Sequence, residues 1–351
     1  MKILKNKSYK VLITTVPFGD KNPLPLVLLK KAGFEFLINP LNKKLTEDEL
    51  LQMVPDVDVI IAGTEKITAK IMDNAPNLQL ISRVGIGLDG IDLNAAKNRG
   101  ISVSYTPDAP TSAVAELTLG IMLTLLRSVH LSNIRMHDGH WQRFFGKRIA
   151  NCTVGIVGVG RIGSEVLRYL KSFNVQKILL NDLHRKSNID KDLNVEWVDK
   201  KTLYKNSDLV SLHLPLTPKT HNLIKKDELY LMKADAALIN TSRGGIINEL
   251  DLYNAMKMGH LSAAAIDVFD DEPYKGKLIE VERCLLTAHM GSMSADCRAR
   301  MEQEATEEAI RFLNNEPLKG SVPNQEYDCL LYTSDAADDL LCVDLGGRRI
   351  I

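Results

Sequence analysis

The sequence has no excess of charge of either sign. Its 351 residues include 44 Lys and Arg and 44 Asp and Glu, which gives a formal net charge of zero. A strongly basic chain attracts nucleic acid, and a polybasic run marks a membrane-binding surface. Because this chain has neither, we expect no nucleic-acid partner, no membrane partner and a small molecule as its ligand.

Long hydrophobic runs are also missing. The most apolar segment, residues 113–129, includes Glu116 and Arg127 and is shorter than the roughly 20 residues that cross a bilayer. The apolar run from Val11 to Phe18 has charged flanks and no small-residue cleavage site, so it indicates a first strand and not a signal peptide. A cytoplasmic protein is therefore expected.

Paired cysteines are absent as well. The five cysteines, at positions 152, 284, 297, 329 and 342, form no CxxC pair and have no ligand-like spacing with the histidines. We therefore expect free thiols and no metal site.

The last residues, 329–351, differ from the chain before them. They read CLLYTSDAADDLLCVDLGGRRII, an Ala and Asp cluster followed by a Gly-Gly-Arg-Arg end. The stretches CLLYTSDAAD and VDLGGRRII match translated sequencing-library adapters in the right order. We therefore predict that residues 329–351 are an adapter artefact outside the fold, with a disordered or interaction tail as the alternative.

The most informative positive feature is the segment TVGIVGVGRIG at residues 153–163. An apolar strand runs into Gly158, Gly160 and Gly163 at GxGxxG spacing. In a dinucleotide site the first glycine permits a sharp turn, the second lets a pyrophosphate approach, and the third lets helix and strand pack closely. The helix beginning near Ile162, beside Arg161, points unpaired N–H groups at the phosphates.

Asp182 provides the acidic residue that this fingerprint requires. It follows the apolar run from Lys177 to Asn181 and lies 19 residues after Gly163. At this position a carboxylate can accept hydrogen bonds from the hydroxyls of the adenosine ribose. The sequence therefore predicts a dinucleotide site that favours NAD over NADP.

Strands and helices alternate in two α/β units. The first unit has expected strands at 11–15, 35–38, 57–62, 78–83 and 101–105, separated by helices at 24–31, 47–53, 69–74 and 93–98. The second begins at Thr153 and continues through strands at 177–181, 210–214, 237–240, 263–268 and 285–287. A helix at 112–129, capped by Thr111 or Ser112, joins the units, and an amphipathic helix at 295–315 follows the second.

Strict alternation predicts parallel sheets that are covered on both faces. We expect an α/β fold with two Rossmann/flavodoxin-like parallel-sheet domains. Residues 1–108 and 297–328 would form a substrate domain that is discontinuous in sequence, and residues 109–296 would form the NAD-binding Rossmann domain. The helix at 295–315 would then cross back to the first unit.

Polar residues follow four strands of the second unit. The segments are SLHLP at 211–215, NTSRGG at 240–245, DVFDDEP at 267–273 and AHMGS at 288–292. Ligands of parallel α/β units bind at the carboxyl ends of the strands. We therefore expect these side chains beside the nicotinamide, in the cleft between the two units.

Several motifs recur in an order typical of one family. They are RVGIGLDGIDL at 83–93, VAE at 114–116, GVGRIG at 158–163, SLHLPLT at 211–217, INTSRGG at 239–245, DVFDDEP at 267–273 and HMGS at 289–292. Over roughly residues 10–325 the chain resembles the D-isomer-specific 2-hydroxyacid dehydrogenases, and among them the phosphoglycerate dehydrogenases most. The resemblance implies an NAD-dependent oxidoreductase acting on a CH–OH group.

By position, the resemblance places the family's catalytic residues on Arg243, Glu272 and His289. Hydride transfer at C2 requires a proton to move as well, and histidine titrates near neutrality. A carboxylate beside the imidazole stabilises its protonated form and fixes its tautomer. A guanidinium holds a carboxylate or polarises an oxo group through paired hydrogen bonds. Taken singly, each residue could instead be a surface ion pair, a turn residue or a structural histidine.

The remaining expected contacts come from the fingerprint, the strand ends and the resemblance. For NAD they are Gly158, Gly160, Arg161, Ile162, Gly163, Asp182, His213, Pro215, Thr220, Thr241, Ser242, Asp267 and Gly291. Asp267 is placed at the nicotinamide carboxamide. For the substrate they are the backbone around Val84 and Gly85, which holds the carboxylate, and Lys66, Arg83 and Arg143, which gather charge for a phosphate, Arg143 from the partner subunit.

These basic residues favour 3-phosphoglycerate, oxidised to 3-phosphohydroxypyruvate in serine biosynthesis. Two departures oppose that choice. Ala62 stands where phosphoglycerate dehydrogenases often have an arginine, and Asp108 replaces a glycine and would repel an anion. Glyoxylate, hydroxypyruvate or another short 2-oxo acid is therefore the alternative.

Two other functional classes share part of the pattern. An NAD-binding corepressor or redox sensor can have this fold and even these three residues, and only a turnover assay separates it from an enzyme. A methyltransferase can share the glycine-rich loop but has no use for Arg, Glu and His at later strand ends. The resemblance also implies a homodimer formed through residues 112–129 and their neighbours.

Overall fold

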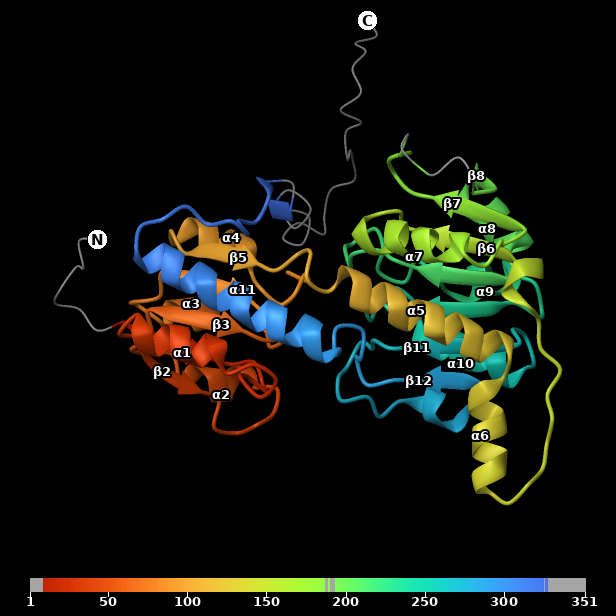
Figure 1. The fold of residues 1–351 in the computed structure, drawn as a ribbon, viewed down its shortest axis with the longest axis horizontal. Helices are drawn as coiled ribbons and strands as arrows, with labels where there is room; N and C mark the ends of the chain where they lie inside the picture. Colours follow the sequence, from red (N-terminus) through yellow and green to blue (C-terminus); the bar gives the residue numbers. More distant parts are fainter. Residues whose placement is uncertain (1–8, 187–188, 190–192, 325, 328–351) are drawn as a thin grey trace, which may run out of the picture.

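The computed structural model describes residues 9–186, 189, 193–324 and 326–327. The predicted adapter segment, residues 329–351, lies outside the described residues. Two lobes lie side by side, each built on a parallel sheet (Figure 1). This confirms the expected α/β class with two parallel sheets.

The first sheet has the strand order β2-β1-β3-β4-β5, and all its pairs are parallel. The central strand β3 is apolar and buried along its whole length, because helices cover both faces of the sheet. The elements are β1 (Lys10–Ile13), α1 (Leu24–Lys31), β2 (Glu35–Ile38), α2 (Glu47–Leu51), β3 (Val59–Ala62), α3 (Ala69–Asp73), β4 (Leu80–Arg83), α4 (Leu93–Asn98) and β5 (Ser102–Tyr105).

The short helices of this lobe begin at polar caps. The side chains of Thr46, Thr68 and Asp92 accept hydrogen bonds from the third backbone N–H of α2, α3 and α4. Each cap satisfies one of the N–H groups that have no partner within the helix. The caps therefore set where the chain turns from a strand end into a helix.

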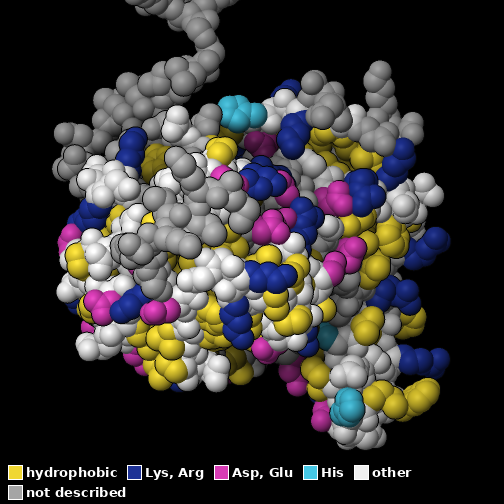
Figure 2. Space-filling view, turned by 60° about the vertical axis from the view of Figure 1, so that its left-hand side comes forward, with side chains coloured by type: hydrophobic (Ala, Val, Ile, Leu, Met, Phe, Trp, Pro, Cys, Tyr) yellow, Lys and Arg dark blue, Asp and Glu magenta, His cyan; other side chains and the backbone are white. Residues whose placement is uncertain are grey.

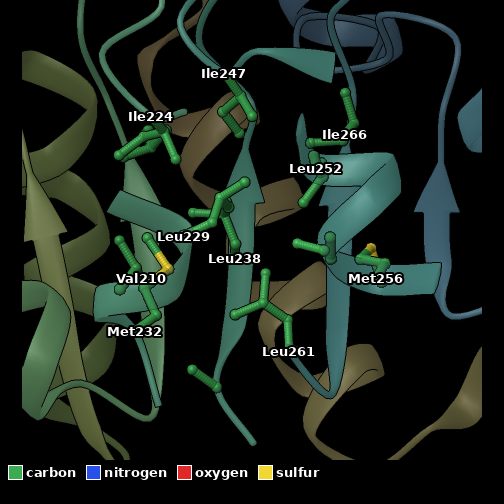
Figure 3. Packing of buried hydrophobic residues seen from close by; sticks show 14 of the residues in the cluster. Val210, Ile224, Leu229, Met232, Leu238, Ile247, Leu252, Met256, Leu261 and Ile266 are labelled. Atoms are coloured by element: carbon green, nitrogen blue, oxygen red, sulfur yellow. The ribbon is translucent and has the colours of Figure 1, made fainter. Parts of the chain in front are cut away.

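The second sheet has the order β12-β11-β10-β9-β6-β7-β8 and is also parallel. Its elements are β6 (Thr153–Val157), α7 (Arg161–Lys171), β7 (Lys177–Asn181), β8 (Val195–Trp197), α8 (Lys200–Asn206), β9 (Leu209–Leu212), α9 (Lys226–Leu231), β10 (Ala237–Asn240), α10 (Glu249–Lys257), β11 (Ala263–Ile266) and β12 (Cys284–Leu286). Aliphatic side chains of β9, β10 and β11 pack against α9 and α10 in a hydrophobic cluster of the second lobe (Figure 3).

The chain crosses between the lobes twice, and a long helix begins after each crossing (Figure 1). α5 (Thr111–Leu126) leaves the first lobe and packs on α7 and β10 of the second. α11 (Ala295–Leu313) returns from the second lobe and packs on α1, β3 and β4, where Ser82 Oγ donates to the carbonyl of Ala305 over 2.8 Å. We propose from this packing that residues 297–328 belong with residues 1–108, and that residues 109–296 form the other domain.

The structure corrects the expected helix at 112–129. α5 has Pro110 at its N-cap and no side-chain cap there, so neither Thr111 nor Ser112 caps it. It ends at Leu126 because Ser128 adopts a left-handed conformation with φ 49°, and α6 (Val129–His137) leaves at an angle of 67°. Among the described residues no single helix is long and apolar enough to cross a membrane, although the bent pair α5 and α6 passes that test together.

Other differences lie in the second lobe. The edge strand β8 was not expected from the sequence, and helices α8, α9 and α10 of the expected alternation had no predicted bounds. The strands predicted at 210–214 and 263–268 end earlier, at Leu212 and Ile266. The next residues, His213 and Asp267, line the cavity between the lobes, so the segments that follow these strands belong to the site and not to the sheet.

On the face of the molecule that Figure 2 shows, basic and acidic side chains are interspersed, and neither sign forms a large patch.

Candidate active site

A cavity of about 580 Å³ lies between the two lobes and is lined by residues from both sheets. Strands of both sheets point their carboxyl ends toward it, which is where parallel α/β folds bind ligands. The cavity brings together most of the predicted site residues: Arg83, Val84, Gly85, Gly160, Arg161, Ile162, His213, Pro215, Thr241, Ser242, Arg243, Asp267, Glu272, His289 and Gly291.

Six predicted residues do not line this cavity: Gly158, Gly163, Asp182, Thr220, Lys66 and Arg143. The side chains of Lys66 and Arg143 are exposed. The Thr220 hydroxyl donates to the carbonyl of Pro215 over 2.6 Å, so Thr220 braces the loop that carries Pro215. Gly158 and Gly163 flank Gly160 in the fingerprint segment, and Asp182 is hydrogen-bonded to Val159 of the same segment.

The three glycines of the fingerprint are required for different geometric reasons. Gly158 has φ 93°, and a Cβ there would come within 2.3 Å of the carbonyl oxygen of His213. A Cβ at Gly163 would lie 2.1 Å from the carbonyl oxygen of Gly158. At Gly160 a Cβ would meet nothing within 4 Å, so its absence leaves open space at the start of α7. That space, at a helix N-terminus without a side-chain cap, fits a phosphate group.

Asp182 is tied to this loop. One carboxylate oxygen accepts from the N–H of Val159 at 2.6 Å, and the other accepts from the N–H of His184 at 3.0 Å. The carboxylate is therefore held at the end of β7 beside the glycine loop, with lone pairs left for further donors.

His289 and Glu272 form a hydrogen-bonded pair. Nδ1 of His289 lies 3.0 Å from both carboxylate oxygens of Glu272, which leaves Nε2 free to meet a ligand. Burial raises the pKa of Glu272, but the hydrogen bond and charge of His289 outweigh burial and hold that pKa below its ordinary value. Glu272 is therefore a carboxylate at neutral pH, and it orients the imidazole.

Asp267 holds the backbone around the histidine. Its carboxylate accepts from the N–H groups of Met290 at 2.7 Å and Gly291 at 2.9 Å, and from the Thr287 hydroxyl at 2.6 Å. His289 itself has φ 52°, an uncommon backbone conformation for a residue with a side chain. These bonds on both sides of His289 stabilise that conformation.

Arg243 is held by contacts from both lobes. The Asn240 side chain donates to the carbonyl of Arg243 at 2.7 Å, which shapes the loop after β10. From the other lobe, Asp89 accepts from Nε of Arg243 at 2.7 Å. Burial raises the pKa of Asp89, but the charge of Arg243 outweighs burial and lowers that pKa. Asp89 lies within the motif RVGIGLDGIDL, yet nothing in the sequence pairs it with Arg243.

Arg83 supports the loop that follows β4. Its guanidinium donates to the carbonyl groups of Gly87 at 3.0 Å and of Ala62 at 3.4 Å, and also to that of Val84. Burial lowers the pKa of Arg83 to about 10, so it stays cationic at neutral pH. The N–H of Gly85 donates to the hydroxyl of Thr106 at 2.8 Å. Much of the hydrogen-bonding capacity at this predicted anion cradle is therefore already engaged by the protein.

Asp108 does not face the cavity as a free charge. Its carboxylate accepts from Nε of Arg161 at 2.8 Å, so it pairs with the residue that follows Gly160. Besides Asp89, five charged residues that the sequence did not single out line the cavity: Lys43, Lys44, Glu65, Arg298 and Glu326. Their spacing in the sequence gives no sign of this, because they come from separate segments, namely the chain after β2, the chain after β3, α11 and the chain after α11.

His213 is a half-buried side chain whose Nδ1 atom is buried and unused. Its Nε2 lies 3.0 Å from Ser211 Oγ, whereas Nδ1 is buried and has no hydrogen-bond partner among the described residues. Burial lowers the pKa of His213 to about 4, so the imidazole is neutral in the folded protein. His213 and Gly160 both line the cavity. A buried Nδ1 that has no hydrogen-bond partner in the protein is expected where a polar ligand supplies one.

This pKa predicts a pH dependence of stability. Between about pH 6.5 and 4 the unfolded chain binds a proton at His213 that the folded chain does not, so stability falls as the pH falls, by up to about 3 kcal/mol. The substitution His213→Gln should reduce the loss of Tm between pH 7 and pH 4.5. Equal losses of Tm in the two proteins would contradict this prediction.

The site therefore combines an open glycine loop, a histidine–carboxylate pair and an anchored arginine around one cavity. The loop suits a dinucleotide, the pair suits proton transfer, and the guanidinium suits a carboxylate or an oxo group. Among the described residues no group of His, Cys, Asp and Glu side chains could hold a metal ion. Cys152, Cys284 and Cys297 are buried free thiols.

Comparison with known proteins identifies the family of this chain. The NAD binding domain of the D-isomer specific 2-hydroxyacid dehydrogenases matches residues 119–291. A hydroxypyruvate reductase of Thermotoga maritima is 37% identical over 297 residues, which cover 81% of this chain and 96% of that protein. A glyoxylate reductase of Thermofilum pendens is 38% identical over 77% of this chain and 83% of its own.

Two further likenesses concern a longer relative and a solved structure. A D-3-phosphoglycerate dehydrogenase of Methanocaldococcus jannaschii is 37% identical over 78% of this chain, but the match spans only 53% of that protein. The structure of D-lactate dehydrogenase from Aquifex aeolicus, complexed with NAD and lactic acid, superposes with a TM-score of 0.78 at 26% identity, covering 87% of this chain and 96% of the other. The chain belongs to the D-isomer specific 2-hydroxyacid dehydrogenase family and is an NAD-dependent oxidoreductase acting on the CH–OH group of 2-hydroxy acids.

Proposed function

We propose that this enzyme reduces a short, unphosphorylated 2-oxo acid with NADH, with hydroxypyruvate as the lead substrate. The observation that carries the proposal is the placement of His289, Glu272 and Arg243 in one cavity beside the open glycine loop. Bound NAD supplies the hydride donor or acceptor. Proton transfer and the binding of the substrate are carried out by side chains of this protein.

His289 acts as the general acid in reduction and as the general base in oxidation. Its Nδ1 is engaged by Glu272, so Nε2 exchanges the proton with the oxygen on C2 of the substrate. The Glu272 carboxylate stabilises the imidazolium form and keeps the ring in place. Arg243 binds the substrate carboxylate or polarises the 2-oxo group, and Asp89 aims its guanidinium.

The charges of the cavity support a substrate without phosphate. Of the basic residues predicted to bind a phosphate within one chain, Lys66 does not line the cavity, and Arg83 is hydrogen-bonded to backbone carbonyl groups. Ala62 stands where phosphoglycerate dehydrogenases often have a further arginine, so this chain has no basic side chain at that position. One relative matched over nearly its whole length is a hydroxypyruvate reductase, and glyoxylate reductases are matched over more than 90% of theirs; both act on short acids without phosphate, which supports this choice.

A second candidate is the conversion between 3-phosphoglycerate and 3-phosphohydroxypyruvate, which the sequence favoured. Lys43, Lys44 and Arg298 line the same cavity and give it basic groups that the sequence did not reveal. Arg298 is already paired with Glu302 and Lys43 with Glu49, which leaves Lys44 as the group that favours this candidate. Glyoxylate is a third substrate, differing from hydroxypyruvate by lacking C3.

A substrate panel tests the proposal. The loss of NADH absorbance is measured with hydroxypyruvate, glyoxylate, pyruvate and 3-phosphohydroxypyruvate, and kcat/KM is compared among them. We expect hydroxypyruvate to give the highest value. A higher value with the phosphorylated acid would select the second candidate, and no turnover with any 2-oxo acid would favour a corepressor-like NAD sensor.

We propose that Asp182 selects NAD over NADP by accepting the ribose hydroxyls. The substitution Asp182→Ala is expected to weaken NAD binding and to raise the ratio of NADPH to NADH use, because the acceptor is lost together with its repulsion of a 2′-phosphate. Asp199→Ala is a matched control, since Asp199 caps α8 instead. An unchanged cofactor ratio in Asp182→Ala would contradict this assignment.

We also propose that two copies assemble and that Arg143 acts in the cavity of the partner. The projecting helix α6 buries none of its residues, and the side chains of Trp141 and Phe145 in the segment after it are exposed (Figure 1). A second copy would cover these apolar groups and use Arg143. A monomeric mass by light scattering at micromolar concentration would overturn this part.

A further inference from the structure

A buried acidic residue, Glu65, lines the cavity on the side of the first sheet. It follows β3 by three residues, and only 3% of it is exposed. One carboxylate oxygen, Oε1, accepts from the N–H of Gly63 at 2.9 Å and from the hydroxyl of Thr14. These two bonds fix where the carboxylate lies.

The second oxygen, Oε2, has no hydrogen-bond donor among the residues that the structure describes. A Cβ on Gly63 would lie 2.7 Å from this oxygen, so the chain needs glycine there to leave the carboxylate room. A carboxylate oxygen at a cavity wall that accepts no hydrogen bond from the protein has lone pairs left for a ligand. Its place in the cavity wall leaves it available to a ligand.

No base neutralises Glu65 by direct contact within the described part of the chain. Arg83 acts on it only through charge, because its hydrogen bonds go to backbone carbonyl groups. Arg298 donates to Glu302 and to the hydroxyl of Thr15. The first-lobe wall therefore presents the Glu65 carboxylate near two guanidinium groups, those of Arg83 and Arg298, whose hydrogen bonds go elsewhere.

Glu65 also adjoins the loop that holds the catalytic arginine. The N–H of Ile67 donates to the carbonyl of Gly90 at 2.7 Å, and a Cβ on Gly90 would lie 2.9 Å from the carbonyl oxygen of Glu65. Asp89 of the same loop binds Arg243. Glu65, Arg243 and His289 line the same cavity, so a substrate held by Arg243 and His289 shares that cavity with the Glu65 carboxylate.

We propose that Glu65 selects the group carried by C3 of the substrate. Its free oxygen accepts a hydrogen bond from a neutral donor such as a hydroxyl, and its charge excludes a phosphate or carboxylate at that position. A site built to bond a hydroxyl discriminates strongly against an analogue that lacks it, because the buried acceptor is then left without a partner. This inference rests on the proposed reduction of 2-oxo acids and specifies the substrate class within it.

The wild-type enzyme provides the first test. Hydroxypyruvate and pyruvate differ only by the hydroxyl on C3, and we expect kcat/KM for hydroxypyruvate to be about 100-fold higher or more. A ratio below about tenfold would overturn the proposal, as would a preference for 3-phosphohydroxypyruvate. This comparison needs no variant and so does not depend on how a substitution folds.

The second test is Glu65→Gln, which keeps an oxygen for Gly63 and Thr14 but turns an N–H₂ group toward the cavity. We expect the ratio of kcat/KM for hydroxypyruvate to that for 3-phosphohydroxypyruvate to fall at least about tenfold, because the repulsion of the phosphate is removed. Asp56→Asn removes a surface charge of the same lobe and should leave this ratio unchanged. Calorimetric binding of D-glycerate and 3-phosphoglycerate should show the same change without turnover.

The possible failures are distinguishable. If the wild-type enzyme turns over no 2-oxo acid, the proposed function fails and this inference fails with it. If it reduces hydroxypyruvate while Glu65→Gln leaves both the kinetic and the binding ratios unchanged, only the role of Glu65 is overturned.

Discussion

Replacing His289 with glutamine is expected to lower kcat by about 10³-fold or more while NAD still binds. Glutamine keeps much of the size and polarity of the side chain but cannot exchange a proton, and positioned general acid–base groups contribute about 10² to 10⁴ in rate. NAD binding should persist because the glycine loop, Asp182 and His213 lie on other strand ends. Steady-state kinetics and titration of NADH fluorescence measure the two quantities separately.

A matched control for this substitution is His260→Gln. His260 lies outside the cavity, where its Nε2 contacts the carbonyl of Leu229 at 2.9 Å and its ring stacks on Tyr230. Its replacement should leave kcat within about a factor of two. Turnover near the wild-type rate in His289→Gln would remove His289 from the mechanism, and a parallel loss of NAD binding would indicate a disturbed fold instead.

The second large effect is expected for Arg243→Lys, with kcat/KM falling by about 10²-fold. Lysine retains the charge but loses the planar fork that can bond Asp89, the carbonyl of Ser242 and a substrate oxygen at once. Removing one donor aimed at a developing negative charge typically costs about 10² to 10³ in rate. Kinetics with hydroxypyruvate, compared with NADH affinity, separate this loss from a loss of cofactor binding.

Arg283→Lys is the control for this second prediction. Arg283 also donates to backbone carbonyl groups, those of Leu261 and Met256, but lies away from the cavity. It should affect stability more than turnover. If Arg243→Lys kept kcat/KM within about threefold of wild type, the charge alone would suffice and the fork geometry would have no part in the reaction.

The fold class could be predicted from the sequence because its signals are local. Apolar runs such as the one in β3 and capping residues such as Thr46 act within a few residues along the chain. Predictions failed where the local pattern was weak or was overridden. The helix expected through Val129 stops at Leu126 because of the backbone conformation of Ser128, although its apolar pattern continues. The short edge strand β8 has too few residues for a clear pattern.

Only part of the candidate site could be predicted from the sequence. Arg243, Glu272 and His289 follow from motifs and from the family resemblance, and their assignment as catalytic residues stays a prediction until the variants are measured. Nothing local marks Asp89 as the partner of Arg243, since the two residues are 154 positions apart. Asp108 was expected to repel an anion, whereas the fold pairs it with Arg161.

By itself the sequence determined that this protein has two parallel α/β units, an NAD fingerprint and the motifs of one dehydrogenase family. These features depend on periodicity, glycine spacing and residue type, which are properties of short segments. Only the tertiary structure decided which charges meet in the cavity: Arg83 supports a loop, Lys66 faces solvent, and Glu65 lies buried in the wall. The reason is physical, because the effect of a charge depends on its distance from other charges and from water, and those distances exist only after the chain has folded.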